Sequence, residues 1–158
     1  MVKSLEDTFP GLTRGGFSVT SPRNTKYNGI AWAAGDTNHW WWPIPDFKEI
    51  YWPPSGACTV SLAAFQDAFA TLGYVECDCE DLEPGFEKVA LFANDQGVPL
   101  HAARQLPGGR WTSKLGELED IEHAWRDLEG TEYGSVAFVM KRSLEAGSHK
   151  EPSAEAGA

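Results

Sequence analysis

The clearest hydrophobic pattern lies near the middle of the chain and predicts an α-helix. Its apolar positions are spaced three, four and three residues apart, and they are Leu62, Phe65, Phe69 and Leu72. That spacing places all four on one face, because an α-helix turns once every 3.6 residues. Thr59 is a suitable N-cap, and Gly73 is the signal that ends the helix.

A shorter helix is expected over residues 29–34, where the sequence reads GIAWAA. Asn28 has the side chain of a good N-cap. Gly35 can end the helix, because glycine readily adopts the left-handed conformation that helix ends require. The side chains of Ile30 and Trp32 are the ones this helix is expected to bury.

A third helix is predicted from a second run with the same spacing. Its apolar positions are Leu118, Ile121, Trp125 and Leu128. The acidic residues along this run are Glu117, Glu119, Asp120 and Glu122. These acidic side chains are expected to form the solvated face of the helix. His123 would lie on the same helix, where we expect it to be structural or exposed.

The rest of the second half predicts β-strands. Four runs rich in apolar residues cover residues 88–93, 98–106, 110–115 and 134–141. Residues 107–109 read PGG and are the expected hairpin turn between the second and third runs. The last run, GSVAFVMK, is apolar enough for a central strand.

The order of these elements favours an α+β fold, in which N-terminal helices pack on a mostly antiparallel sheet. Residues 27–142 are expected to form a single domain. Residues 1–26 are rich in Gly, Pro, Ser and Thr, so they are predicted to be an irregular lead-in. Residues 143–158 offer little to bury and are predicted to be a disordered tail.

Composition and charge narrow the classes of partner. A chain of 158 residues with 42% apolar residues can bury a core without disulfide or metal staples. Its formal charge of −10 disfavours nucleic acids and anionic membranes, because phosphate binding depends on Lys and Arg. No stretch reaches the roughly 20 apolar residues of a membrane helix. The sequence carries no glycine-rich phosphate motif, and no cofactor is expected.

Cysteine usage bears on the cellular compartment. The cysteines are Cys58, Cys77 and Cys79, an odd number, and the N-terminal residues lack the apolar segment of a secretion signal. We therefore expect free thiols and a cytoplasmic location, with delivery as a secreted effector as the alternative. A metal site at Cys77 and Cys79 would need further Cys or His ligands nearby, and the sequence offers none.

Residues 36–58 are predicted to be a loop, because prolines interrupt both helices and strands. Its aromatic residues are Trp40, Trp41, Trp42, Tyr51 and Trp52. One interpretation is a lid that packs over the core, since aromatic rings bury large areas. The other is a platform for a sugar or an apolar ligand above a cleft. His39, in the same loop, is expected to be structural or exposed.

Three places carry side chains suited to chemistry. Asn28 and Gly29 begin the short helix, His101 lies on a strand, and Ser113 and Lys114 lie on the next strand. The hairpin turn brings these two strands together, so Ser113 is expected within about one position of pairing with His101. A polar neighbour of this kind can fix which ring nitrogen of a histidine carries the proton.

The sequence motifs around these residues resemble those of an uncharacterised bacterial domain family. They are YNGIAWAAGD, PLHAARQLPGGRWTSKLG and YGSVAFVMKR, and the resemblance runs from about residue 27 to residue 141. In that family the first motif reads Tyr-Asn-Cys-Ile-Ala-Trp-Ala. The family pattern in turn looks like the papain-like, NlpC-type arrangement, with a cysteine at a helix start, a histidine on a following strand and a polar residue on the next.

The resemblance implies roles for individual residues. Gly29 stands at the nucleophile position, His101 would be the base, and Ser113 or a neighbour would orient it. Asn28 and Gly29 would supply backbone donors to an oxyanion pocket. Trp32, Trp41, Trp42 and Lys114 are the residues expected to shape the cleft. Because glycine has no side chain, Gly29 provides no nucleophile.

Three functions follow from this pattern. The first is a hydrolase scaffold of the amide or peptide class that is inactive in this form, either because Gly29 is native or because it was introduced to silence the protein. The second is a non-catalytic domain that holds a peptide-like or protein ligand through its tryptophan-rich loop. The third is an effector or toxin-type domain silenced at Gly29. Cys58, which precedes the helix of residues 62–72, is the one serious substitute nucleophile.

Overall fold

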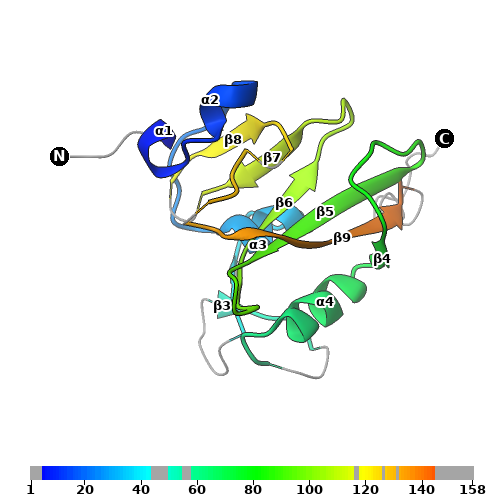
Figure 1. Ribbon diagram of the computed structural model, residues 1–158. Coiled ribbons are helices and arrows are strands. Elements are labelled where there is room, and N and C mark those ends of the chain that lie inside the picture. Colours follow the sequence, from blue (N-terminus) through cyan, green and yellow to red (C-terminus); the bar gives the residue numbers. More distant parts are fainter. Residues whose placement is uncertain are drawn as a thin grey trace.

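The computed structural model describes residues 5–43, 50–54, 58–115, 118–125, 127–130 and 132–144 (Figure 1). Its helices are α1 (Leu5–Thr8), α2 (Leu12–Gly15), α3 (Gly29–Ala34) and α4 (Leu62–Ala70). The first strands are β1 (Ser18–Ser21), β2 (Trp40–Trp41), β3 (Ile50–Tyr51) and β4 (Val75–Cys77). The remaining strands are β5 (Phe86–Ala93), β6 (Pro99–Gln105), β7 (Trp111–Lys114), β8 (Asp120–His123) and β9 (Ser135–Ser143).

Seven of these strands form one sheet in the order β1-β8-β7-β6-β5-β9-β4. Each neighbouring pair is antiparallel. The predicted α+β class with a mostly antiparallel sheet is therefore confirmed. β2 and β3 form a separate parallel pair inside the segment predicted to be a loop, and they lie on either side of residues 44–49.

Both faces of the sheet are buried, which explains the continuous apolar run of β5. Val89 and Leu91 pack in a cluster with residues of α3 and α4. Ala90 and Phe92 point the other way and pack in a cluster that includes Leu12 of α2. Successive side chains of a strand alternate between faces, so one strand serves both clusters. In Figure 1, α1 and α2 lie near β8, and α4 lies on the other side of the sheet.

The caps of the two longer helices show how local sequence fixes their ends. α3 begins after Asn28 and ends at Gly35, which has a φ of 90°, as predicted. α4 is capped by Ser61, whose hydroxyl accepts a hydrogen bond from the Ala64 amide. The expected cap, Thr59, is wrong because it lies two residues too early, and its hydroxyl contacts Ser61 instead.

The N-terminal segment differs from the predicted irregular lead-in. Within residues 5–26 lie α1, α2 and the strand β1, which pairs with β8 at one edge of the sheet. Phe9 and Leu12 are buried against this end of the sheet. The strand was missed because its partner lies about 100 residues away in the sequence, so no local pattern reports it.

The helix predicted over residues 118–128 is wrong. Residues 120–123 form β8, which pairs with β7 on one side and β1 on the other. The expected solvated acidic face is also wrong at Asp120, which is fully buried and accepts a hydrogen bond from the Tyr27 hydroxyl at 2.9 Å. The apolar spacing suited a helix, but two neighbouring strands supply the backbone partners here.

The other predicted strands are found with small changes at their ends. β5, β6, β7 and β9 correspond to the runs at residues 88–93, 98–106, 110–115 and 134–141. β9 is an interior strand that lies between β5 and the edge strand β4. β4 was not predicted, because Val75–Cys77 is short and its side chains are largely exposed.

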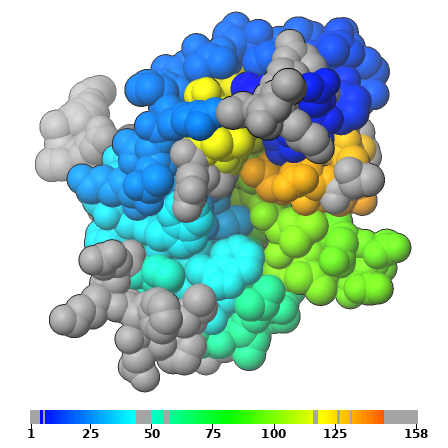
Figure 2. All heavy atoms as spheres, turned by 90° about the vertical axis from the view of Figure 1, so that its left-hand side faces the viewer, coloured from blue at the N-terminus to red at the C-terminus, as the bar shows by residue number. Residues whose placement is uncertain are grey.

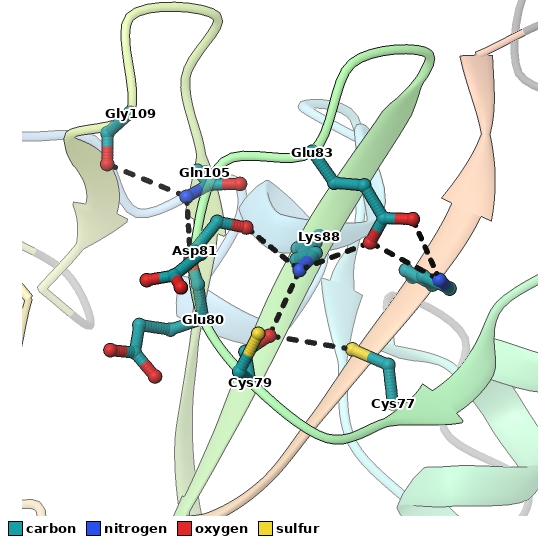
Figure 3. A network of polar contacts seen from close by, with 9 residues as sticks. Cys77, Cys79, Glu80, Asp81, Glu83, Lys88, Gln105 and Gly109 are labelled. Carbon is teal, nitrogen blue, oxygen red and sulfur yellow. Dashed lines mark hydrogen bonds and ion pairs between the residues drawn. The ribbon is translucent and has the colours of Figure 1, made fainter.

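A buried lysine holds the connection between β4 and β5 (Figure 3). The Lys88 ammonium donates to the backbone carbonyls of Cys79 at 2.9 Å and Asp81 at 2.7 Å. It also lies 3.5 Å from the carboxylate of Glu83. From the other side, the Gln105 amide donates to the carbonyl of Glu80. The loop is thus fastened to β5 and β6 through its own backbone.

The described residues include no helix long and apolar enough to cross a membrane. Ser143, the first residue of the expected tail, is the last residue of β9. The tail prediction for residues 145–158 lies outside the described residues.

Candidate active site

The start of α3 is held in place by the side chain of Asn28. Its carbonyl oxygen accepts hydrogen bonds from the amides of Ala31 and Trp41, both at 3.1 Å. Its amide nitrogen donates to the Trp41 carbonyl at 2.8 Å. One buried side chain therefore caps the helix and fastens β2 to it. The cap predicted from the sequence is confirmed, and it fixes the position of the next residue, Gly29.

Gly29 lies against the ring of His101. A β-carbon built on Gly29 would lie 2.7 Å from His101 Nδ1, 2.8 Å from His101 Cε1 and 2.7 Å from the carbonyl oxygen of Lys114. Distances under 3.0 Å are shorter than real Cβ contacts, so a side chain here requires a shift of its neighbours. The helix start and the strand histidine, 72 positions apart in the sequence, are thus brought into direct contact.

A chain of hydrogen bonds runs from His101 across three neighbouring strands. His101 Nε2 on β6 lies 3.0 Å from Ser113 Oγ on β7. Ser113 Oγ lies 2.8 Å from His123 Nε2 on β8. His123 Nδ1 in turn lies 2.9 Å from the backbone carbonyl oxygen of Ala124. The predicted proximity of His101 and Ser113 is therefore found, and His123 extends the chain by one member.

The acceptor at the end of this chain fixes every proton in it. The Ala124 carbonyl only accepts, so His123 Nδ1 carries the proton. In a neutral ring His123 Nε2 then accepts from the Ser113 hydroxyl, and Ser113 Oγ accepts from His101 Nε2. His101 Nδ1 is consequently the unprotonated nitrogen. It carries a lone pair on the side of the ring that faces Gly29.

Burial keeps both rings neutral. Desolvation, with a smaller contribution from His123, lowers the pKa of His101 well below its ordinary value of 6.5. Desolvation also lowers the pKa of His123 to about 4, against the opposing effect of its bond to Ala124. At neutral pH His101 is therefore uncharged, and its Nδ1 is a hydrogen-bond acceptor.

Aromatic contacts hold the His101 ring in its orientation. The ring of Tyr133 stacks on it, and the ring of Phe92 lies at its edge with centroids 5.2 Å apart. Only 2% of the His101 surface is exposed. Burial also raises the pKa of the Tyr133 hydroxyl, so this neighbour is neutral as well. Stacking and the bond to Ser113 together leave one orientation for the imidazole.

A cavity of about 320 Å³ opens beside this pair. Its apolar wall is made by Ile30, Trp40, Trp42, Ile50 and Leu100. Gly29, His101 and Tyr133 line it as well, together with Asn28. In Figure 2 the cyan surface, which includes β2, lies beside the green surface of the chain around residue 100, and the orange surface of the segment before β9 lies above the green. The lining residues come from these segments and from α3 and β3.

Several residues expected to shape the cleft do not line this cavity. Trp41 is buried in the core, and its indole donates to the Asp36 carboxylate. Trp32 donates to the Thr112 hydroxyl. The Lys114 ammonium donates to the Asn24 carbonyl. Of the expected residues, Asn28, Gly29, His101 and Trp42 do line it. The aromatic loop thus supplies both a core residue and a cavity wall.

Two residues at the site were missed in the sequence. His123 was assigned to a helix, and the assignment to β8 changes it from a structural or exposed residue to the buried partner of Ser113. The placement of Ile121 and His123 on either side of Glu122, two residues apart as on one face of a strand, was the available signal. Tyr133 carried no local signal, because only the folded chain brings it to His101.

The cysteines lie outside this cavity. Cys58 and Cys79 are exposed, and Cys77 is half-buried. Desolvation raises the pKa of the Cys77 thiol, which disfavours the thiolate form. Among the described residues no group of three or more His, Cys, Asp or Glu side chains could hold a metal ion.

Comparison with known proteins gives a family match. A family model described as "Domain of unknown function (DUF7689)" matches residues 18–141, which is most of the chain. No curated protein and no solved structure matches.

Proposed function

This chain belongs to the DUF7689 family, and from that premise we propose that it is a papain-like amide-hydrolase scaffold without its nucleophile. In this form it binds a peptide-like ligand and does not cleave it. The proposal assigns the vacant nucleophile position to Gly29, the base to His101 and the orienting residue to Ser113.

The observation that carries the proposal is the contact between Gly29 and His101 Nδ1. A side chain at position 29 would begin 2.7 Å from a ring nitrogen that carries a lone pair. A nucleophile and its base must lie within hydrogen-bond reach, and a side chain at position 29 would be that near His101 once the ring and the Lys114 carbonyl shift to make room.

The parent chemistry follows from the proton positions. A thiol at position 29 would lose its proton to His101 Nδ1 and attack the carbonyl carbon of an amide. The imidazolium that forms keeps its Nε2 proton on Ser113, whose own proton is held by His123. His101 then returns the proton to the leaving amine, as a general acid does.

The protein with Gly29 lacks the nucleophilic sulfur that would begin this reaction. Gly29 cannot form an acyl intermediate, but the cavity, the base and the polar chain behind it remain. Trp40 and Trp42 line the cavity, which supports binding through the aromatic loop as the surviving activity. The second function considered from the sequence, a binding domain, thus describes the same cavity without its chemistry.

The test is to restore the thiol and measure its reactivity. Cys58, Cys77 and Cys79 are first replaced by alanine, so that a Gly29→Cys variant carries one thiol. Its alkylation rate is measured against pH with and without His101→Ala. We expect a thiolate pKa well below the ~8.5 of a free cysteine, and a return toward that value without His101.

Two further variants separate packing from chemistry. Gly29→Ala adds the same β-carbon without the sulfur, so its stability shows what the steric contact costs. Ser113→Ala removes the orienting hydroxyl, and we expect it to raise the thiolate pKa partway. A folded Gly29→Cys protein whose thiol titrates normally, with or without His101, would refute the proposal.

A further inference from the structure

We infer that the cavity selects an uncharged ligand with an apolar body and one hydrogen-bond donor. The ligand donates this hydrogen bond to His101 Nδ1. This inference rests on the proposed function, because it names the ligand class of the same site. Three features carry it: the walls, the state of the polar groups and the fixed tautomer of His101.

The walls exclude charge. Among the described residues that line the cavity there is no Asp, Glu, Lys or Arg. The titratable residues among them are His101 and Tyr133. Burial lowers the pKa of His101 and raises the pKa of Tyr133, so both side chains are uncharged at neutral pH. A charged ligand would lose its hydration without gaining an ionic partner, which is costly.

The polar groups leave one prominent acceptor. The side chain of Asn28 already bonds to Ala31 and to both backbone groups of Trp41. No hydrogen bond between described residues reaches His101 Nδ1. A ligand that buries this nitrogen without donating to it would leave a buried acceptor unpaired, which disfavours binding.

The tautomer cannot adapt without loss. If the proton moved to His101 Nδ1, then Nε2 would become a second acceptor beside Ser113. The single Ser113 proton could then serve His101 or His123 but not both, since His123 Nε2 already accepts it. One buried ring nitrogen would be unpaired in either case. The site therefore distinguishes a donor from an acceptor at this atom.

The size of the cavity sets the scale of the ligand. A volume of about 320 Å³ is at the lower end of the range of ligand pockets. It suits a single ring with a short substituent, or one side chain of a peptide together with an adjacent N–H group. Trp40, Trp42 and Tyr133 offer aromatic contacts to such a ring.

The test uses four probes that share one aromatic body. Benzyl alcohol supplies a donor, benzyl methyl ether lacks it, and benzylammonium and benzoate carry opposite charges. Each is titrated into the full chain while the ¹⁵N resonances of the His101 ring are followed by NMR. We expect benzyl alcohol to shift the Nδ1 resonance and to bind about tenfold or more tightly than each of the other three.

Matched variants link this preference to the polar chain. Ser113→Ala removes the acceptor of His101 Nε2, so both tautomers become accessible and the preference for the alcohol over the ether should shrink. His123→Gln can still donate to Ala124 and accept from Ser113, so the preference should persist. A merely structural role for Ser113 would weaken both probes equally.

Three outcomes overturn the inference: equal binding of the ether, tighter binding of either charged probe, or no binding of benzyl alcohol up to its solubility limit. The proposed function fails separately, through an unreactive Gly29→Cys thiol. A reactive thiol with no donor preference would leave the scaffold assignment standing and remove only the ligand class.

Discussion

The imidazole ring of His101 and the phenol ring of Tyr133 are parallel, with planes 1° apart and centroids separated by 4.1 Å. Tyr133 lies between β8 and β9 in the chain, so the segment that precedes β9 positions the ring of His101 on β6. The stack shields one face of the imidazole from water and directs its edge at Gly29.

Removal of the stack should change the titration of His101. We expect Tyr133→Leu to raise the pKa of His101 toward 6.5, because water reaches the exposed face and desolvation is the main cause of its lowering. Tyr133→Phe keeps a flat ring there and should leave the pKa low. An NMR titration of both variants measures this, and the same pKa in the two would contradict a shielding role.

A β-carbon at position 29 should destabilise the fold. Gly29→Ala is expected to cost about 1–3 kcal/mol, because the methyl group meets His101 and the Lys114 carbonyl. The matched control is Gly108→Ala, where a β-carbon has no neighbour within 4 Å and the change should stay within about 0.5 kcal/mol. Denaturant unfolding compares the two. Equal stabilities would mean that His101 and the Lys114 carbonyl move aside without a cost in stability.

Acid should destabilise the protein through its buried histidines. Folding lowers the pKa of His101, and it lowers the pKa of His123 to about 4. Below pH 6.5 the unfolded chain therefore binds protons at these histidines that the folded protein does not bind. Stability is complete above about pH 6.5 and falls as the pH drops toward 4. For His123 alone the loss over this window is about 3 kcal/mol.

The variant His123→Gln isolates that contribution. Glutamine can keep the hydrogen bonds to Ser113 and Ala124 but does not titrate, so the fall in stability between pH 6.5 and 4 should be shallower. Thermal unfolding across this range measures the slope. An unchanged slope would show that His123 is accessible to protons in the folded protein.

Local sequence predicted what local contacts determine. The α3 helix followed from Asn28 and Gly35, because both caps act within a few residues of the elements they end. The face of α4 followed from its spacing, although the cap proved to be Ser61. β5 and β9 were recognisable because strands buried on both faces are continuously apolar.

Long-range pairing produced the errors. The segment containing Ile121 had helical spacing, yet β1 and β7 recruit it as a strand from about 100 and about 10 residues away. Because that strand was missed, the role of His123 was missed as well. Tyr133, in the segment between β8 and β9, comes next to His101 only in the folded chain. The candidate site was therefore predictable in part. Sequence motifs pointed to Gly29, His101 and Ser113, whereas only the fold shows their partners His123 and Tyr133.

The neighbouring tryptophans should separate stability from binding. Trp41 is 4% exposed and bonded to Asp36, so Trp41→Ala should cost about 3–5 kcal/mol. Trp42 is half-buried and lines the cavity, so Trp42→Ala should weaken ligand binding with a smaller loss of stability. Thermal unfolding and probe titration of both variants test this. A large loss of stability only in Trp42→Ala would reverse the assignment.

Two lysines that share Glu83 provide a comparison of buried and exposed cations. Lys88→Met should cost about 2–4 kcal/mol, because the carbonyls of Cys79 and Asp81 lose their donor while the side chain is 2% exposed. Lys141→Met should cost clearly less, since Lys141 is more exposed and bonds to Glu83 alone among these partners. Denaturant unfolding ranks the two variants by their loss of stability. A larger loss in Lys141→Met would contradict a main role for Lys88 in holding the loop between β4 and β5.

The position of β9 constrains how the protein is made on the ribosome. β9 is the last of the described strands along the chain but lies between β5 and β4, and it is the strand with which β4 pairs. While residues 135–143 are still unsynthesised, the long apolar edge of β5 has no partner, and such an edge invites pairing between nascent chains. A premature stop before residue 135, or close spacing of ribosomes on one message, would therefore leave this edge of β5 open to pairing between chains.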